Sequence, residues 1–143
     1  MAKFMKNINL ISRSAEAFRE EKLAGSGISA CQTKYVLAIA ANPGISQEEL
    51  SRALFVNKSN AARQTGLLVQ AGFVRREENA KDRRAVLLFP TQKLIQALPL
   101  VKSVHAEWRE LVTEGFTEQE RAVLASLTEK MVANAARYME GRQ

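Results

Sequence analysis

Side chains of the kinds that bind nucleic acid are concentrated in one stretch of this sequence. Between Arg52 and Arg84, eight basic residues stand against three acidic ones, a net charge of +5; the other 13 basic and 12 acidic residues leave +1 for the rest of the chain. Such a confined positive charge suggests a surface for a polyanion, because basic side chains that neutralise phosphates release counterions. Composition alone leaves a solvated surface loop equally open, so the spacing of the residues has to decide.

The segment from residue 58 to 71 has the pattern of a helix that reads DNA. Ala61, Thr65 and Leu68 recur at steps of three and four and predict its packing face. The first residues of such a helix meet base edges in the major groove, where arginine suits guanine and asparagine or glutamine suits adenine, although each can also hold a phosphate. A solvated helix face is the alternative for these residues taken alone. The residues expected to face outward are Lys58, Asn60, Arg63 and either Gln64 or Leu67. The contacts predicted from this segment are Lys58, Ser59, Asn60, Arg63 and Gln64.

A charged hairpin follows this helix. Phe73–Arg76 and Ala85–Phe89 are predicted as strands, with a polar loop between them from Glu77 to Arg84. A loop-tip arginine steadied by a neighbouring aspartate suits a narrow minor groove, whose negative potential attracts guanidinium groups. The alternative is a surface ion pair worth about 0–1 kcal/mol and no function. The contacts predicted from the loop are Lys81, Asp82, Arg83 and Arg84.

Local signals place a short helix before the longer one. Ser46 and Glu49 have the spacing of a capping box, and Ser46 joins the predicted DNA-binding residues as the cap of that helix. Asn57 suits the cap of the longer helix, and Gly72 suits its end, with Phe73 behind it as the hydrophobic contact. Gly66, in the interior of that helix, indicates close packing against a neighbouring helix. A short helix, a turn, a longer helix and a hairpin are the order of a winged helix-turn-helix.

The flanking segments are predicted to be helical. Apolar residues at helical spacing mark helices over residues 3–22, 30–41, 92–114 and from Thr117 onward. Thr117 and Glu120 have the spacing of a second capping box, which opens the last helix. The first and last helices carry apolar stripes too large for one small lobe to cover, so we expect the first helix to pack against the C-terminal helices or against a second subunit. The expected fold is therefore mainly α (α+β), one domain over residues 1–143. Its winged helix-turn-helix lobe is expected at about 28–91, and its dimerisation helices at about 1–24 and 92–143.

Other classes of protein have little support in the sequence. One cysteine and one histidine exclude an internal disulfide framework and leave too few ligands for a zinc site. We find no nucleophile–base set, no recognisable pair of carboxylates and no glycine-rich phosphate loop, so we expect neither an enzyme nor a cofactor. No apolar run reaches the roughly 20 residues that a membrane span needs, and the N-terminus lacks the pattern of a secretory signal. We expect the protein in a reducing cytoplasm.

The stretch from Ile45 to Thr91 resembles the MarR family of bacterial transcription regulators. The family's wing carries an Asp-x-Arg pattern ending in Leu-Thr; Asp82, Arg84 and Thr91 match this pattern, and Pro90 replaces the leucine. The segment from residue 57 to 63 is similar to the start of the family's recognition helix. The order of elements and the chain length also match.

The resemblance implies a homodimer that binds a pseudo-palindromic operator in double-stranded DNA, usually as a repressor. It also implies a small-molecule effector, often an aromatic or phenolic acid, that binds between the dimerisation helices and the DNA-binding lobe. Tyr35, His105 and Trp108 are the candidate effector-pocket residues, with a place in the core or an interface as the alternative. Cys31 does not match the first-helix cysteine of peroxide-sensing relatives and is interpreted as a small apolar residue. A winged-helix protein-interaction module without a DNA role is the competing hypothesis.

Overall fold

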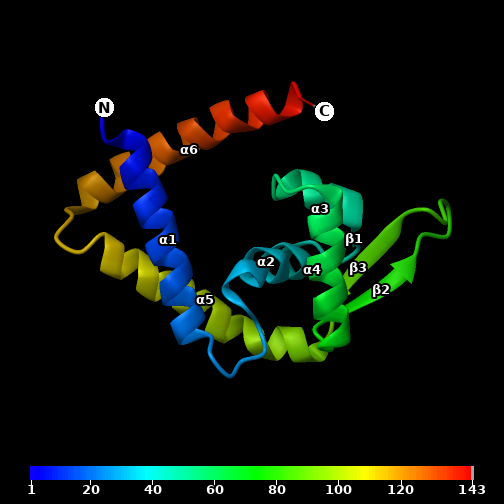
Figure 1. Cartoon of the computed structure of the whole chain (residues 1–143). Coiled ribbons are helices and arrows are strands. Elements are labelled where there is room, and N and C mark those ends of the chain that lie inside the picture. The colour runs from blue at the N-terminus through cyan, green and yellow to red at the C-terminus, as the bar shows by residue number, and fades with distance from the viewer. Residues whose placement is uncertain (143) are drawn as a thin grey trace. The chain divides into compact units, whose positions relative to one another are not determined.

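The computed structural model describes residues 1–142 and is mainly helical with one small antiparallel sheet, as the sequence predicts (Figure 1). The chain divides into two compact units, one ending at Trp108 and the other beginning at Arg109. Within residues 1–142, no helix has both the length and the apolar character needed to cross a membrane. The elements are α1 (Phe4–Lys22), a 3-10 helix η1 (Ala30–Gln32), α2 (Thr33–Ala41), β1 (Ile45–Ser46), α3 (Gln47–Ala53), α4 (Lys58–Gln70), β2 (Val74–Glu78), β3 (Val86–Pro90), α5 (Gln92–Val112) and α6 (Glu118–Glu140).

Strand β3 lies in the middle of the sheet, in the order β1-β3-β2. On one side it pairs antiparallel with β1, where Ser46 lies opposite Leu87. On the other side it pairs antiparallel with β2, where Arg76 lies opposite Leu88. Strand β1 was not predicted, because two residues are too short to show an alternating pattern and only the pairing with β3 makes them a strand.

The helix-turn-helix packs on this sheet through one apolar core. Leu50 of α3, Leu68 of α4 and Leu88 of β3 are all fully buried, with 0% of each residue exposed. The predicted inner face of α4 is confirmed, since Ala61 and Thr65 are buried as well. These contacts fix the faces that α3 and α4 turn toward solvent.

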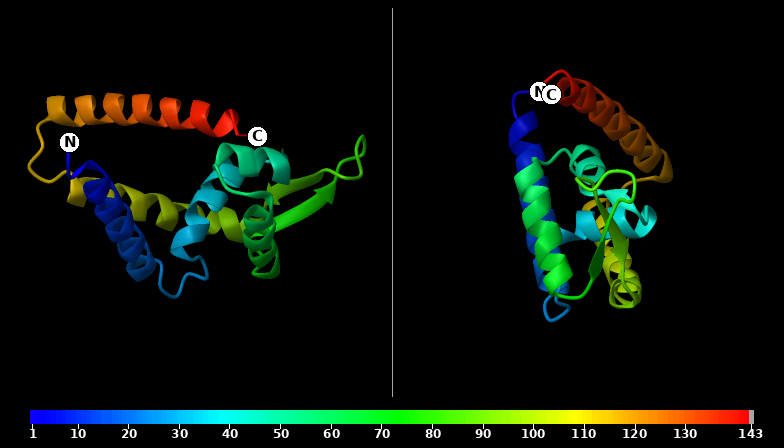
Figure 2. Two further views of the ribbon diagram at one scale, coloured as in Figure 1. Left: turned by 45° about the horizontal axis from the view of Figure 1, so that its top comes forward. Right: turned by 90° about the vertical axis from the view of Figure 1, so that its right-hand side faces the viewer.

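The first strand of the wing extends two residues further than predicted, and the loop is shorter. Strand β2 begins at Val74 and continues to Glu78, which pairs with Val86. Only Val74 among the residues of β2 is buried, so no alternation in the sequence marked the extension. The hairpin projects from the rest of the lobe and carries its loop at the tip (Figure 2). Two helices also differ from the prediction. The segment predicted as one helix over residues 30–41 divides into η1 and α2, and α5 ends at Val112 instead of residue 114.

The C-terminus of α4 closes as a Schellman motif. The amide of Gly72 donates to the carbonyl of Val69 at 3.0 Å, and the amide of Phe73 donates to the carbonyl of Leu68 at 2.9 Å. Gly72 has a φ of +83°, the left-handed region in which a glycine meets no steric penalty. Phe73 is buried with 1% exposed, so the predicted glycine cap and its apolar contact are both confirmed.

The start of α5 holds the same end of α4. The Thr91 hydroxyl donates to the carbonyl of Gly72 at 2.6 Å, and the Lys93 ammonium donates to the carbonyl of Ala71 at 2.5 Å. The Lys93 nitrogen also lies 4.5 Å from the centroid of the Phe73 ring. A cation at a helix C-terminus is favourable because the terminal carbonyls carry partial negative charge.

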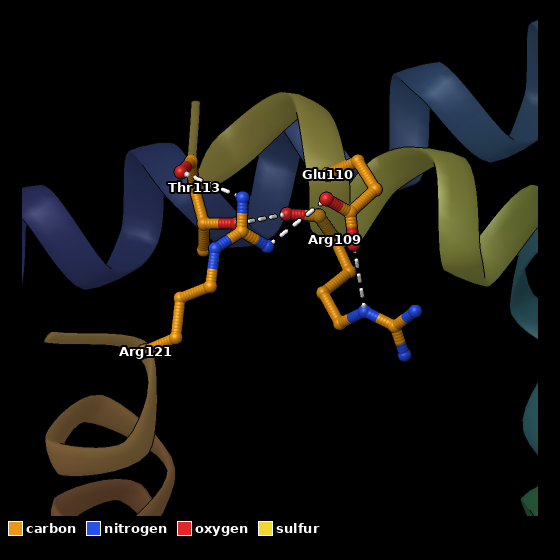
Figure 3. Close-up of polar contacts among 4 residues, drawn as sticks. All are labelled: Arg109, Glu110, Thr113 and Arg121. Carbon is orange, nitrogen blue, oxygen red and sulfur yellow. Dashed lines mark hydrogen bonds and ion pairs between the residues drawn. The ribbon is translucent and has the colours of Figure 1, made fainter. Parts of the chain in front are cut away.

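In the second unit, Arg121 of α6 closes the turn between α5 and α6 (Figure 3). Its guanidinium donates to the Glu110 carboxylate at 3.0 Å and to the backbone carbonyl of Thr113 at 3.2 Å. The Thr113 hydroxyl in turn donates to the carbonyl of Arg109 at 2.6 Å. Helix α6 opens with the predicted capping box, in which Thr117 and Glu120 exchange hydrogen bonds of 2.8 and 3.2 Å.

We expect Lys93→Met to lower the free energy of unfolding by about 0.5–1 kcal/mol. Methionine keeps an apolar chain of similar length over Phe73 and removes the charged donor to Ala71. Urea unfolding of the variant beside Lys102→Met, a change at an exposed position of the same helix, measures the effect. Equal midpoints for the two variants would contradict a stabilising role for the contact.

Candidate DNA-binding surface

The turn between α3 and α4 presents the start of α4 to solvent. The Asn57 side-chain oxygen accepts from the amide of Asn60 at 2.7 Å, as predicted for the cap, and from the Ser59 hydroxyl at 3.1 Å. Lys58, Ser59 and Arg63 are exposed and Asn60 is partly buried. The Arg63 guanidinium donates to the Asn60 side-chain oxygen at 3.4 Å, so the two side chains most suited to reading bases lie side by side.

The predicted outward orientation of Gln64 is wrong. Only 7% of Gln64 is exposed, and its side-chain oxygen is buried without a hydrogen-bond partner among the described residues. The reason is helical geometry, because Gln64 lies three residues after Ala61 and four before Leu68 and shares their buried face. The exposed residue at this level of the helix is Leu67, which is 45% exposed.

Ser46 occupies the cap position but forms only half of the predicted capping box. Its hydroxyl accepts from the amide of Glu49 at 3.0 Å. Among residues 1–142, the reciprocal bond from the Ser46 amide to the Glu49 carboxylate is absent. Ser46 is 9% exposed, so it contributes to the surface mainly by fixing the start of α3.

The loop of the wing is organised by two side chains that accept backbone hydrogen bonds. The Asp82 carboxylate accepts from the amide of Arg84 at 3.0 Å, and the Asn79 side chain accepts from the amide of Lys81 at 3.0 Å. Asp82 therefore acts on the backbone of Arg84. In the described part of the chain, no acidic group lies within ion-pair distance of Lys81, Arg83 or Arg84. All three basic residues are exposed.

A hollow of about 170 Å³ lies where the three segments with predicted contacts meet. Ser46 contributes from the start of α3, Lys58 from the start of α4 and Arg84 from the wing. Lys58 also lies 3.7 Å from the Glu48 carboxylate, but both side chains are largely exposed, so this pair is weak and a phosphate can compete for the lysine. Residues more than 35 positions apart in the sequence thus form one surface.

Arg76 is a basic residue beside α4 that the sequence-based prediction leaves out. A side-chain carbon built at Gly66 would lie 3.4 Å from the Arg76 guanidinium. The close neighbour expected at Gly66 is therefore a side chain of strand β2 and not a helix. The interior glycine was the available signal, but the identity of its neighbour depends on the pairing of β2 with β3.

The three candidate effector-pocket residues lie in two environments. Tyr35 is 1% exposed in α2, and its hydroxyl has no hydrogen-bond partner among residues 1–142. Burial raises the pKa of Tyr35 above its ordinary value of 10.0; the nearby Cys31 adds to the rise and Arg63 opposes it. His105 and Trp108 face α1, where the Trp108 ring lies 5.5 Å from the Phe18 ring.

Burial also lowers the pKa of His105 below its ordinary value of 6.5, with the charge of Arg19 as the second cause. The Nε2 atom of His105 is buried without a partner in the described chain, and so is the Nε atom of Arg19. Buried nitrogens that carry a hydrogen and have no partner suit an acceptor such as a carboxylate. Cys31 is exposed, contrary to its interpretation as a buried apolar residue, and its sulfur lies 3.2 Å from the Ser29 hydroxyl.

Comparison with known proteins agrees with this geometry. A sequence model of the MarR family matches residues 26–85. The HTH-type transcriptional regulator BilQ of Clostridium symbiosum is 32% identical over 114 residues, which are 80% of this chain and 79% of BilQ.

Two solved structures extend the likeness to nearly the whole chain. A MarR transcriptional regulator of Methanosarcina mazei Go1 is 30% identical with a TM-score of 0.89, covering 96% of this chain and 99% of its own. A MarR-family regulator of Listeria monocytogenes, solved in complex with a 26mer DNA, is 27% identical with a TM-score of 0.88, covering 94% and 90%. The chain belongs to the MarR family of transcriptional regulators and is not an enzyme.

Proposed function

We propose that this regulator is a homodimeric repressor that binds a pseudo-palindromic operator and is released by a small aromatic acid. The observation that carries the DNA contact is the gathering of exposed basic residues at the start of α4 and the tip of the wing, around the hollow that Lys58 and Arg84 line. In the proposed complex, α4 enters the major groove and the wing loop follows the minor groove. The solved complex of the Listeria regulator with DNA supports this class of partner.

The proposed contacts divide by role. Arg63, aligned with Asn60, is assigned to base edges, because a guanidinium can make two hydrogen bonds to one guanine. Lys58 and Ser59 are assigned to phosphates at the edge of the groove. Arg83 and Arg84 are assigned to the minor groove, with Lys81 on the backbone and Asp82 shaping the loop. Gln64 has no place in this set because it is buried.

The proposed dimer rests on exposed apolar surface at both ends of the chain. Helix α6 runs for 23 residues without one buried residue, and α1 buries only Ala15. Large apolar side chains on these helices are 40–63% exposed, which is unusual for a monomer. Those on α1 are Met5, Ile8, Leu10 and Ile11, and those on α6 are Val123, Leu124, Leu127, Met131, Val132 and Tyr138.

The proposed effector contacts are His105, Trp108 and Tyr35. The unpartnered nitrogens of His105 and Arg19 offer donors for a carboxylate, and the Trp108 ring offers apolar surface for an aromatic group. Release of DNA requires that the effector bind better to a form of the protein that fits the operator poorly. We place this regulation in the cytoplasm, where the operator would lie.

We expect Arg63→Ala and Arg84→Ala each to weaken operator binding about tenfold or more. Arg63→Ala also relaxes the preference for one base, whereas Arg84→Ala flattens the dependence of affinity on salt. The operator is selected from a random duplex pool and from the region upstream of the gene, and affinity is measured by mobility shift at several salt concentrations. Lys102→Ala, on α5, is the control; equal affinity for all three variants would exclude this surface.

We expect Leu127→Glu to convert the dimer to a monomer at micromolar concentration. A charge on the α6 stripe would be buried without a partner in the dimer. Ser126→Glu, one residue away and outside the apolar stripe, introduces the same charge and should leave the dimer intact. Sedimentation velocity measures both, and a dimer that persists in Leu127→Glu would place the interface elsewhere.

We expect salicylate or benzoate to change the fluorescence of Trp108, the chain's single tryptophan, and to weaken operator binding over the same concentration range. Acetate, which has the carboxylate without the ring, is the control. His105→Gln should raise the concentration of aromatic acid at half-effect. Operator binding unaffected by any aromatic acid at millimolar concentration would count against an effector of this class.

A further inference from the structure

The turn between α3 and α4 contains a strained aromatic residue. Phe55 has a φ of +54° and is the one residue other than glycine with positive φ in residues 1–142. This left-handed region is disfavoured for a residue with a side chain, because the Cβ atom approaches the carbonyl oxygen. The turn closes through backbone hydrogen bonds, from the amide of Phe55 to the carbonyl of Arg52 at 3.3 Å and from the amide of Val56 to the carbonyl of Ser51 at 3.1 Å. Glycine would take this conformation without strain.

Phe55 is neither in the buried core cluster nor among the residues packed against it. It is 45% exposed, whereas its neighbours Leu54 and Val56 are partly buried and pack against the core cluster. These two residues anchor the turn on either side. A large apolar ring thus stands at the surface, at a position where the backbone favours glycine.

Phe55 lies close in sequence to residues of the proposed DNA-binding surface. Phe55 precedes the Asn57 cap of α4 by two residues. The exposed residues Arg52 and Lys58 lie three residues before and three residues after it in the sequence. If α4 enters the major groove with its N-terminus first, the residues just before its cap reach the edge of that groove. There the apolar surfaces of DNA are the thymine methyl group and the deoxyribose, and phenylalanine is suited to contact them.

We propose that Phe55 is a DNA-contacting residue whose ring packs against the apolar edge of a nucleotide beside the start of α4. This inference rests on the proposed placement of α4 in the major groove and adds an apolar contact to the polar and charged set. It also explains why a ring stands at a position of backbone strain. Replacing the ring therefore affects stability and DNA binding in opposite directions, which a purely structural residue would not do.

The test compares Phe55→Gly, Phe55→Asn and Phe55→Leu on the selected operator by fluorescence anisotropy, with thermal unfolding of each variant. Glycine and asparagine both tolerate the left-handed conformation, so neither variant should unfold below the wild-type temperature. We expect both to bind the operator five- to tenfold more weakly. Phe55→Leu, which keeps an apolar side chain, should stay within about threefold of wild type. Phe116→Gly, which removes a ring 42% exposed in the turn after α5, is the matched control and should bind as wild type.

Operators in which single thymines are replaced by deoxyuridine distinguish the two apolar surfaces. If deoxyuridine at one position weakens operator binding by the wild type but not by Phe55→Gly, the ring contacts the thymine methyl group at that position. If Phe55→Gly binds more weakly than the wild type but no position behaves in this way, the ring contacts a deoxyribose. Wild-type affinity in stable Phe55→Gly and Phe55→Asn overturns the proposal. So does a loss of affinity matched in Phe116→Gly. If the wild type itself selects no operator, the proposed function fails instead, so the two failures are distinguishable.

Discussion

The two antiparallel pairings of strand β3 are the constraint on which the DNA-binding lobe depends. One pairing holds β1, which leads directly into α3, and the other holds β2, which follows directly from α4. Leu88 takes part in both pairings and is fully buried, so the strand also belongs to the core in which Leu50 and Leu68 pack. The start of α3 and the base of the wing are therefore fixed to the same strand, and the hollow between Ser46 and Arg84 follows from this arrangement.

Helix α4 is held at both ends by groups outside its own hydrogen-bond ladder. Asn57 caps its start, whereas Thr91 and Lys93 of the following segment bind the carbonyls at its end. The second contact joins the helix proposed to read bases to the first turn of α5. A change in α5 would reach α4 through the carbonyls of Ala71 and Gly72 without passing through the core. A link of this kind couples two sites where the contact has two discrete arrangements.

The sequence predicts what depends on neighbours three or four residues away. The caps at Asn57 and Thr117, the glycine at Gly72 and the inner face of α4 are all of this kind, and the structure confirms them. What escaped prediction depends on distant partners: β1 exists only through β3, and Arg76 approaches Gly66 only because β2 follows the same strand. Gln64 is different, since its spacing from Ala61 and Leu68 already placed it on the inner face, and its polar character was given too much weight.

The exposed charge of one lobe also bears on why the chain would act as a dimer. Each lobe offers a few cations at the start of α4 and the tip of the wing, and Lys58 already has Glu48 nearby. A single lobe of this size binds DNA weakly at physiological salt, because each phosphate contact loses affinity as counterions become abundant. Two lobes joined through α1 and α6 would bind the second half-site at a high effective concentration, provided that the half-sites lie about 34–36 Å apart or a multiple of that distance. Specificity would then reside in the spacing as much as in Arg63 or Phe55, because a lobe that meets the wrong half-site loses the contribution of its partner.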